Sequence, residues 1–334
     1  MPFYSIAGKS KAPLWMLLFF SMLVIKTNGS PGDTLIKRSP EIYFTELKQL
    51  PGAKDSSSFI LPFSRAGNLL LIKAKADSTE GNFVLDTGCP GLVLNITYFR
   101  NYPTTVEPNA ESQGITNDGV RAEQIVIHTF HFGTINEYNV TADLVNLGNI
   151  ENSKGIKVLG LVGMQFLKDC EMIIDYQKNQ ICFHVFGRKQ SGSYKNQMLN
   201  DTAAYHTVPF DIMNDRIIIK TTMAGKKLRF VIDCAAEINI LDSRLPDKIL
   251  ENLSITGRIL LTGVGNKKVE AVTGSLPHFS IGSRIINDMP VLITNLEKTC
   301  FSANGCVDGV LGLDGLSITK IGFNFTTFKM YIWK

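Results

Sequence analysis

The stretch FVLDTGCPGLVL (residues 83–94) places an acid, a threonine and a glycine directly after three apolar residues. Short apolar runs of this kind are typical of buried β-strands, and a carboxylate beside a buried strand needs a structural or chemical reason. A second stretch, FVIDCAAEINIL (residues 230–241), repeats the pattern 147 residues later. The acid is kept, as Asp86 and Asp233, whereas the threonine and the glycine are replaced by cysteine and alanine.

The repeat extends well beyond the two acids. Residues 61–94 align with residues 208–241 without a gap, and residues 158–183 match residues 309–333 further along. Each copy contains short apolar runs with partial alternation and hairpin-like segments with polar turns, and no long helical period. An internal repeat of this length predicts an all-β chain with two tandem β-barrel lobes.

The repeat and the composition of the chain ends predict five segments. They are a signal peptide (1–29), an N-terminal tether (30–57), a first lobe (58–186), a linker (187–206) and a second lobe (207–334). Within the linker, GRKQSGSYKNQ is polar and contains glycine and serine, as connecting segments commonly do.

The N-terminal segment indicates export. Lys9 and Lys11 precede the apolar run LWMLLFFSMLVI (residues 14–25). A membrane-spanning helix needs about 20 apolar residues, so this run suits the core of a signal peptide better. An uncleaved anchor is the alternative. No other run approaches this length, and we therefore expect a mature chain without a membrane span, located in the periplasm, at the cell surface or outside the cell.

The charge balance gives no electrostatic case for a strongly charged partner. The chain has 44% hydrophobic and 19% charged residues, which is typical of a globular protein, and a net charge of +4. Without the lysines of the predicted signal peptide, 31 basic residues face 30 acidic ones. This balance gives no reason to expect nucleic acid or an anionic membrane surface as a partner.

Six cysteines in an exported chain can form disulfides. Cys300 and Cys306 lie in one short loop, CFSANGC, and are the candidate disulfide on spacing alone. Cys89 and Cys234, beside the two acids, are expected to be small buried fillers, with a disulfide or redox role as the alternative. The CxxC spacing of a zinc site is absent from the sequence, so we predict no metal site.

The duplicated acid has a chemical consequence if the lobes pack about a pseudo-twofold axis. Asp86 and Asp233 would then lie close enough to share one proton, because two adjacent carboxylates cannot easily both ionise. The charged member can activate a water for attack on a peptide carbonyl, and the protonated member can protonate the leaving nitrogen. Such a site needs no cofactor.

Asp86-Thr87-Gly88, preceded by FVL, resembles the active-site turn of retropepsin-like and pepsin-like aspartic proteases. Each copy also carries that family's second element, two hydrophobic residues and a glycine: Leu161-Val162-Gly163 and Val310-Leu311-Gly312. The resemblance covers roughly residues 59–334. The segment that leads into each acid further resembles the exported bacterial members of the retropepsin-like group. The family resemblance implies a pepsin-like pair of lobes with a cleft between them, the second element supporting each turn, a peptide or protein substrate, and a monomer that contains an internal pseudo-dimer.

The second turn, Asp233-Cys234-Ala235, departs from this family pattern. In the family the two turn threonines hydrogen-bond across the axis and hold the acids in place. Because a thiol is a weak donor and acceptor, we expect Cys234 to loosen this clasp. We also expect Ala235 to restrict the close approach of backbone amides that glycine permits.

Three functional hypotheses follow. The first is an aspartic endopeptidase with Asp86 and Asp233 as the catalytic pair. The second keeps the fold as a catalytically impaired pseudoprotease that binds extended peptides. The third is an exported β-barrel protein for lipid or glycan, in which both acids are ordinary turn residues and lie far apart. In the first two, hairpin tips near residues 114–123 and 261–271 are candidate flaps over the cleft.

Overall fold

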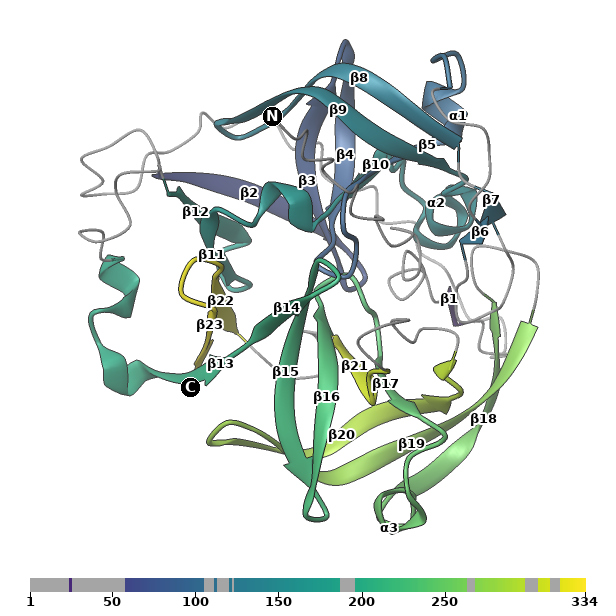
Figure 1. Cartoon of the computed structure of the whole chain (residues 1–334), viewed down its shortest axis with the longest axis vertical. Coiled ribbons are helices and arrows are strands. Elements are labelled where there is room, and N and C mark those ends of the chain that lie inside the picture. The colour runs from purple at the N-terminus through teal and green to yellow at the C-terminus, as the bar shows by residue number, and fades with distance from the viewer. Residues whose placement is uncertain are drawn as a thin grey trace, which may run out of the picture.

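The computed structural model describes nine stretches of the chain: residues 24–25, 58–104, 111–112, 120–121, 123–186, 196–262, 268–297, 306–312 and 319–334. They form two β-rich lobes, one above the other in Figure 1. The predicted all-β class and the two-lobed arrangement are confirmed. The predicted tether and the tips of both candidate flaps lie outside the described residues.

The first lobe is built from antiparallel hairpins and two parallel strand pairings. Its strands are β2 (Ser58–Ala66), β3 (Leu69–Ala76), β4 (Thr79–Leu85), β5 (Leu92–Asn95), β8 (Glu123–Phe132), β9 (Ile135–Val145), β10 (Gly160–Val162), β11 (Cys170–Asp175) and β12 (Gln180–Val185). The short pair β6 (Glu111–Ser112) and β7 (Val120–Arg121) flanks the first candidate flap tip.

The second lobe repeats this order. Its strands are β14 (Asp211–Met213), β15 (Arg216–Met223), β16 (Lys226–Asp233), β17 (Asn239–Asp242), β18 (Ser254–Thr262), β19 (Lys268–Ile281), β20 (Arg284–Thr294), β21 (Gly309–Gly312), β22 (Lys320–Asn324) and β23 (Lys329–Trp333), with β13 (Tyr205–Pro209) leading in. β1 (Val24–Ile25), inside the predicted signal segment, pairs with β18.

Helices are few and short. They are α1 (Ile96–Phe99), α2 (Gly148–Lys154), α3 (Asp247–Leu250) and the 3-10 turns η1 (Met164–Phe166), η2 (Gln197–Leu199) and η3 (Thr202–Ala204). Among the described residues, no helix is long and apolar enough to cross a membrane.

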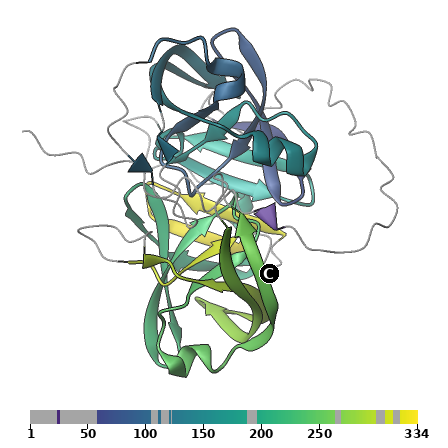
Figure 2. The same cartoon turned by 90° about the vertical axis from the view of Figure 1, so that its right-hand side faces the viewer.

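The two lobes share a sheet, which the sequence did not predict. β22 of the second lobe pairs antiparallel with β11 of the first, its equivalent in the repeat, with Met172 opposite Phe323. The shared sheet therefore runs β13-β23-β22-β11-β12-β2. In Figure 2 the yellow C-terminal strands lie between the teal strands of the first lobe and the green strands of the second.

The core follows from this sharing. One buried hydrophobic cluster contains Phe83 and Phe230, which are equivalent residues of the two lobes, and also Phe183 and Phe323 of the shared sheet. The lobes are thus joined by continuous apolar packing, and their relative position is fixed by the same burial that stabilises each of them.

The second element of each repeat crosses behind the turn that carries the acid. β10 runs parallel to β4, with Val162 beside Leu85, and the Asp86 amide donates to the Val162 carbonyl at 3.0 Å. β21 lies in the same way against β16, with Gly312 beside Asp233. The supporting role that the resemblance implied for these segments agrees with this pairing.

Gly163, at the end of β10, is required by close packing. A β-carbon at this position would overlap with the carbonyl oxygens of Cys89 and Gly91, both of which belong to the chain just after Asp86. These are backbone atoms, so the turn itself would have to move to make room.

Gly163→Ala is therefore expected to lower the free energy of unfolding by about 2 kcal/mol or more, measured by chemical denaturation. Gly148→Ala is the matched control, because its β-carbon would meet only the end of the exposed Asn146 side chain. Equal effects of the two substitutions would contradict this account of Gly163.

Candidate active site

Asp86 lies directly after β4, at the start of a turn that contacts the second lobe. Its Oδ1 atom accepts hydrogen bonds from the backbone amides of Gly88 at 2.8 Å and Cys89 at 3.1 Å. Only 1% of the residue is exposed. Two amide donors on one oxygen stabilise the charged carboxylate and fix its orientation.

The second turn reproduces this geometry. Asp233 Oδ1 accepts from the amides of Ala235 at 2.8 Å and Ala236 at 3.1 Å, and the residue is fully buried. The expectation that Ala235 would restrict the approach of the amides is therefore wrong. The reason is that the alanine methyl packs among apolar side chains of the first lobe, Leu69 and Val84 included, and leaves the amides unobstructed.

Thr87 and Cys234 form a reciprocal clasp between the two turns. Thr87 Oγ1 donates to the Ile232 carbonyl at 3.1 Å and accepts from the Cys234 amide at 2.9 Å. Cys234 Sγ donates to the Leu85 carbonyl at 3.2 Å and accepts from the Thr87 amide at 3.3 Å. The thiol thus makes both of the bonds that the threonine hydroxyl makes, and the expected loosening of the clasp does not occur.

The clasp brings the two acids together. A β-carbon built on Gly88 would lie 2.6 Å from Cγ of Asp233, so the first turn approaches the opposite carboxyl as closely as its backbone allows. Glycine is needed there because any side chain would occupy the space of that carboxyl. The hypothesis of a lipid- or glycan-binding barrel with the two acids far apart is wrong.

Asp233 is held in a state that favours a bound proton. Burial raises its pKa well above the ordinary value, and the negative charge of Asp86 raises it further. Its Oδ2 atom is buried and has no hydrogen-bond donor among the described residues. An ionised oxygen in that position would be poorly stabilised, so the pair is expected to carry one shared proton over a wide range of pH.

Arg216 is a site residue that the sequence reading missed. The side chain, 2% exposed, lies behind the first turn, and its Nε donates to the Gly88 carbonyl at 3.1 Å. Burial lowers its pKa to about 10, and the nearby negative charge of Asp86 opposes this effect. It therefore stays charged near neutral pH. The repeat held a signal for it, because Arg216 occupies the position of the core residue Leu69.

A second cation crosses between the lobes. Lys154, at the end of α2, forms an ion pair with Glu237, which follows the second turn. The two side chains are 18% and 17% exposed, so the pair is shielded from solvent more than a surface ion pair is. Together with Arg216, it ties each lobe to the turn of the other.

The cysteines near the acids are thiols. Cys89, Cys170, Cys182 and Cys234 are free and buried. Burial raises the pKa of the Cys89 and Cys234 thiols, and the nearby Asp86 raises both further, so neither is a nucleophile near neutral pH. Cys306 is disulfide-bonded, and its predicted partner Cys300 lies outside the described residues.

No arrangement of three or more His, Cys, Asp or Glu side chains within the described stretches would hold a metal ion. The two carboxyls form a pair, and their amide donors occupy one oxygen of each.

Residues 219–314 match the family model described as aspartyl protease. This part of the chain is therefore similar to the aspartyl protease family. The matched segment includes the altered second turn and Val310-Leu311-Gly312, so the resemblance predicted from the sequence is confirmed. No curated protein matches the sequence.

Several solved structures are similar to this chain. A retropepsin-like aspartic protease from Rickettsia conorii is 15% identical, over 43% of this chain and 98% of that chain, with a TM-score of 0.29. EDGP is 10% identical, over 83% of this chain and 94% of that one, with a TM-score of 0.44. Basic 7S globulin from soybean is 8% identical, over 83% and 94%, with a TM-score of 0.40.

The clasp can be tested with an isosteric pair of substitutions. Cys234→Thr retains a donor and an acceptor, whereas Cys234→Val has nearly the same shape and leaves the buried Thr87 amide without its acceptor. We expect the threonine variant to unfold with a free energy about 1–3 kcal/mol higher than the valine variant in chemical denaturation. Equal stabilities would show that the thiol acts only as a space filler.

The raised pKa of Asp233 predicts how stability depends on pH. An unfolded aspartate has a pKa of about 3.9, so the folded wild type binds this proton more tightly and loses stability as pH rises from about 4 through the raised pKa. The asparagine side chain of the Asp233→Asn variant does not titrate. The difference in unfolding free energy between this variant and the wild type should therefore grow in favour of asparagine across that interval and level off above it.

Denaturation series at several pH values would measure this difference. Asp288→Asn, at an exposed position on β20 of the second lobe, should show no such trend. A difference between Asp233→Asn and the wild type that stays constant with pH would contradict the shared-proton description.

Proposed function

We propose that this protein is an aspartic endopeptidase that hydrolyses peptide bonds with Asp86 and Asp233 as its catalytic pair. The observation that carries the proposal is the symmetry of the two turns. Each carboxyl receives the same two amide bonds, at 2.8 and 3.1 Å, and the clasp of Thr87 and Cys234 is complete despite the substitution. The family match supports peptides or proteins as the substrate class.

The chemistry follows from one proton shared by two carboxyls. The ionised member takes a proton from a water as the water oxygen bonds to the peptide carbonyl carbon. The protonated member donates to the carbonyl oxygen. When the C–N bond breaks, the protonated member donates its proton to the leaving nitrogen, and the ionised member takes a proton from a hydroxyl of the tetrahedral intermediate as the new carboxyl C=O forms. The pair thus returns to its starting charge. No cofactor takes part in these steps.

Arg216 is proposed as a positioning residue in this reaction. Its bond to the Gly88 carbonyl fixes the backbone that donates to Asp86, and its buried positive charge favours the state in which one of the acids is ionised. Only the second lobe supplies such a residue, since Leu69 stands at the equivalent place, so the two acids lie in different electrostatic surroundings.

The chain is also proposed to be exported. The signal-like N-terminal segment and the disulfide at Cys306 both favour an oxidising compartment.

A pseudoprotease that binds extended peptides is the second candidate. Two observations favour it: both carboxyls are at most 1% exposed, and the second turn lacks the threonine and the glycine of the family pattern. It shares the fold and the substrate class with the enzyme and differs from it in the absence of turnover.

Asp86→Asn decides whether the pair acts in catalysis. We expect this variant to lose cleavage of denatured protein substrates by at least about 10²-fold while the protein stays folded by circular dichroism, because the ionised member is removed. Asp288→Asn, the exposed control, should cleave like the wild type. Absence of cleavage by the wild type at every pH from about 3 to 7.5, beside active control proteases, would overturn the proposal.

The double variant Cys234→Thr with Ala235→Gly distinguishes an active peptidase from a protein that has lost activity through changes in the second turn. Because the clasp is already complete, an active wild type should change by less than about tenfold. An inactive wild type that gains cleavage in the double variant would support a pseudoprotease derived from an enzyme.

A further inference from the structure

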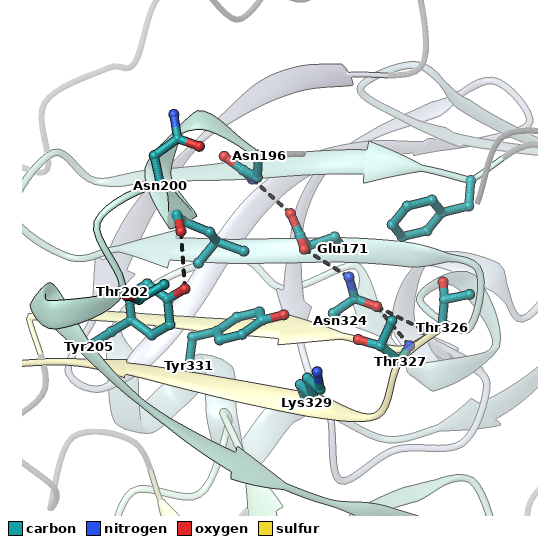
Figure 3. A pocket seen from close by; sticks show the side chains of 12 residues that line it. Glu171, Asn196, Asn200, Thr202, Tyr205, Asn324, Thr326, Thr327, Lys329 and Tyr331 are labelled. Carbon is teal, nitrogen blue, oxygen red and sulfur yellow. Dashed lines mark hydrogen bonds between the residues drawn. The ribbon is translucent and has the colours of Figure 1, made fainter. Parts of the chain in front are cut away.

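The shared sheet carries a pocket of about 520 Å³ on the face that the core does not use. Along β11, Cys170, Met172 and Ile174 point into the core cluster, so the side chain of Glu171 between them lies on the opposite face. Figure 3 shows Glu171 at the centre of this pocket, with Tyr205, Tyr331 and Lys329 around it. The catalytic pair does not line this pocket.

Glu171 is a buried carboxylate held by two neutral amides. It is 3% exposed, and its two oxygens accept from Asn196 Nδ2 and Asn324 Nδ2, each at 2.8 Å. The orientation of both amides is fixed elsewhere, because Asn196 Oδ1 accepts from the Met198 amide and Asn324 Oδ1 accepts from the Thr327 amide. The asparagines must therefore donate to Glu171, an arrangement that suits its ionised form.

Glu171 has no cationic partner within the described part of the chain. None of the ion pairs found there includes it. Burial raises its pKa, and only the two asparagines oppose this effect. A buried charge without a counter-ion is destabilising relative to a paired one, so this carboxylate is well matched to a positively charged ligand.

The walls of the pocket narrow the class of ligand. Tyr205 and Tyr331 pack edge to face, with ring centres 5.3 Å apart. Burial raises the pKa of both phenols, and the nearby charge of Glu171 raises it further. Aromatic rings beside a carboxylate favour a cation with apolar surface. Lys329, an exposed residue on the same lining, supplies a positive charge that would attract an anionic group.

We propose that this pocket binds a free amino acid, with the ammonium group at Glu171, the carboxylate toward Lys329 and the side chain against Tyr205 and Tyr331. The volume of about 520 Å³ lies in the range of small-molecule sites. The site is independent of the proposed peptidase activity, since neither acid of the catalytic pair lines the pocket.

Binding of three phenylalanine compounds to the full-length protein tests this proposal. Phenylalanine carries both charges, phenylalaninamide only the ammonium group, and N-acetylphenylalanine only the carboxylate. Isothermal titration calorimetry should rank phenylalanine first, the amide second, and the N-acetyl compound at least about tenfold weaker than phenylalanine.

Two variants assign the charges to residues. Glu171→Gln should weaken phenylalanine at least about tenfold, because the amide side chain cannot neutralise an ammonium group. Lys329→Gln should weaken phenylalanine and leave phenylalaninamide unchanged, since the amide has no carboxylate to lose. Glu137→Gln, at an exposed position on β9, is the control and should bind all three compounds like the wild type.

Three results would overturn the proposal: no binding of phenylalanine up to about 10 mM, equal binding of the N-acetyl compound, or unchanged binding by Glu171→Gln. If Glu171→Gln does not fold, the compound series on the wild type and on Lys329→Gln still decides the question. None of these results bears on the proposal that the catalytic pair cleaves peptides, because the two sites are separate.

Discussion

The reciprocal hydrogen bonds between Thr87 and Cys234 are the constraint on which this site depends. They cross from one lobe to the other where two strand ends carry acids in matching positions, and they use backbone groups of both turns. The strand that leads into each turn is also paired with a parallel strand, β4 with β10 and β16 with β21. The clasp therefore joins two turns that are each held by a sheet. The separation of the two carboxyls is therefore set by the backbone.

Replacing a hydroxyl by a thiol changes less than the chemistry of the isolated groups predicts. A thiol is a weak partner, but both of its bonds are formed in a buried setting of low dielectric constant, where hydrogen bonds are stronger than in water. The electrostatic difference between the lobes comes from elsewhere. Arg216 places a cation behind the first turn, and Lys154 pairs with Glu237 beyond the second, so a symmetric fold holds an asymmetric pair of acids.

The shared sheet explains how one chain can carry two separate polar sites. Its inner face continues the hydrophobic core through both lobes, while its outer face is free of that requirement and holds Glu171 between two asparagines. Alternation along β11 separates the two environments by a single residue step. A carboxylate can therefore lie on this sheet without weakening the core that positions the catalytic pair.

The sequence by itself determined the β class, the two lobes and the equivalence of Asp86 with Asp233, because an internal repeat constrains each copy by the other. The family resemblance implied the supporting role of the segments that end in Gly163 and Gly312. Tertiary structure alone decided the rest. That Cys234 completes the clasp, that Ala235 finds space among apolar side chains, and that β22 pairs with β11 depend on distances between residues far apart in the chain. Arg216 and Glu171 became visible for the same reason, since their significance lies in what surrounds a buried charge and not in the residues beside them in sequence.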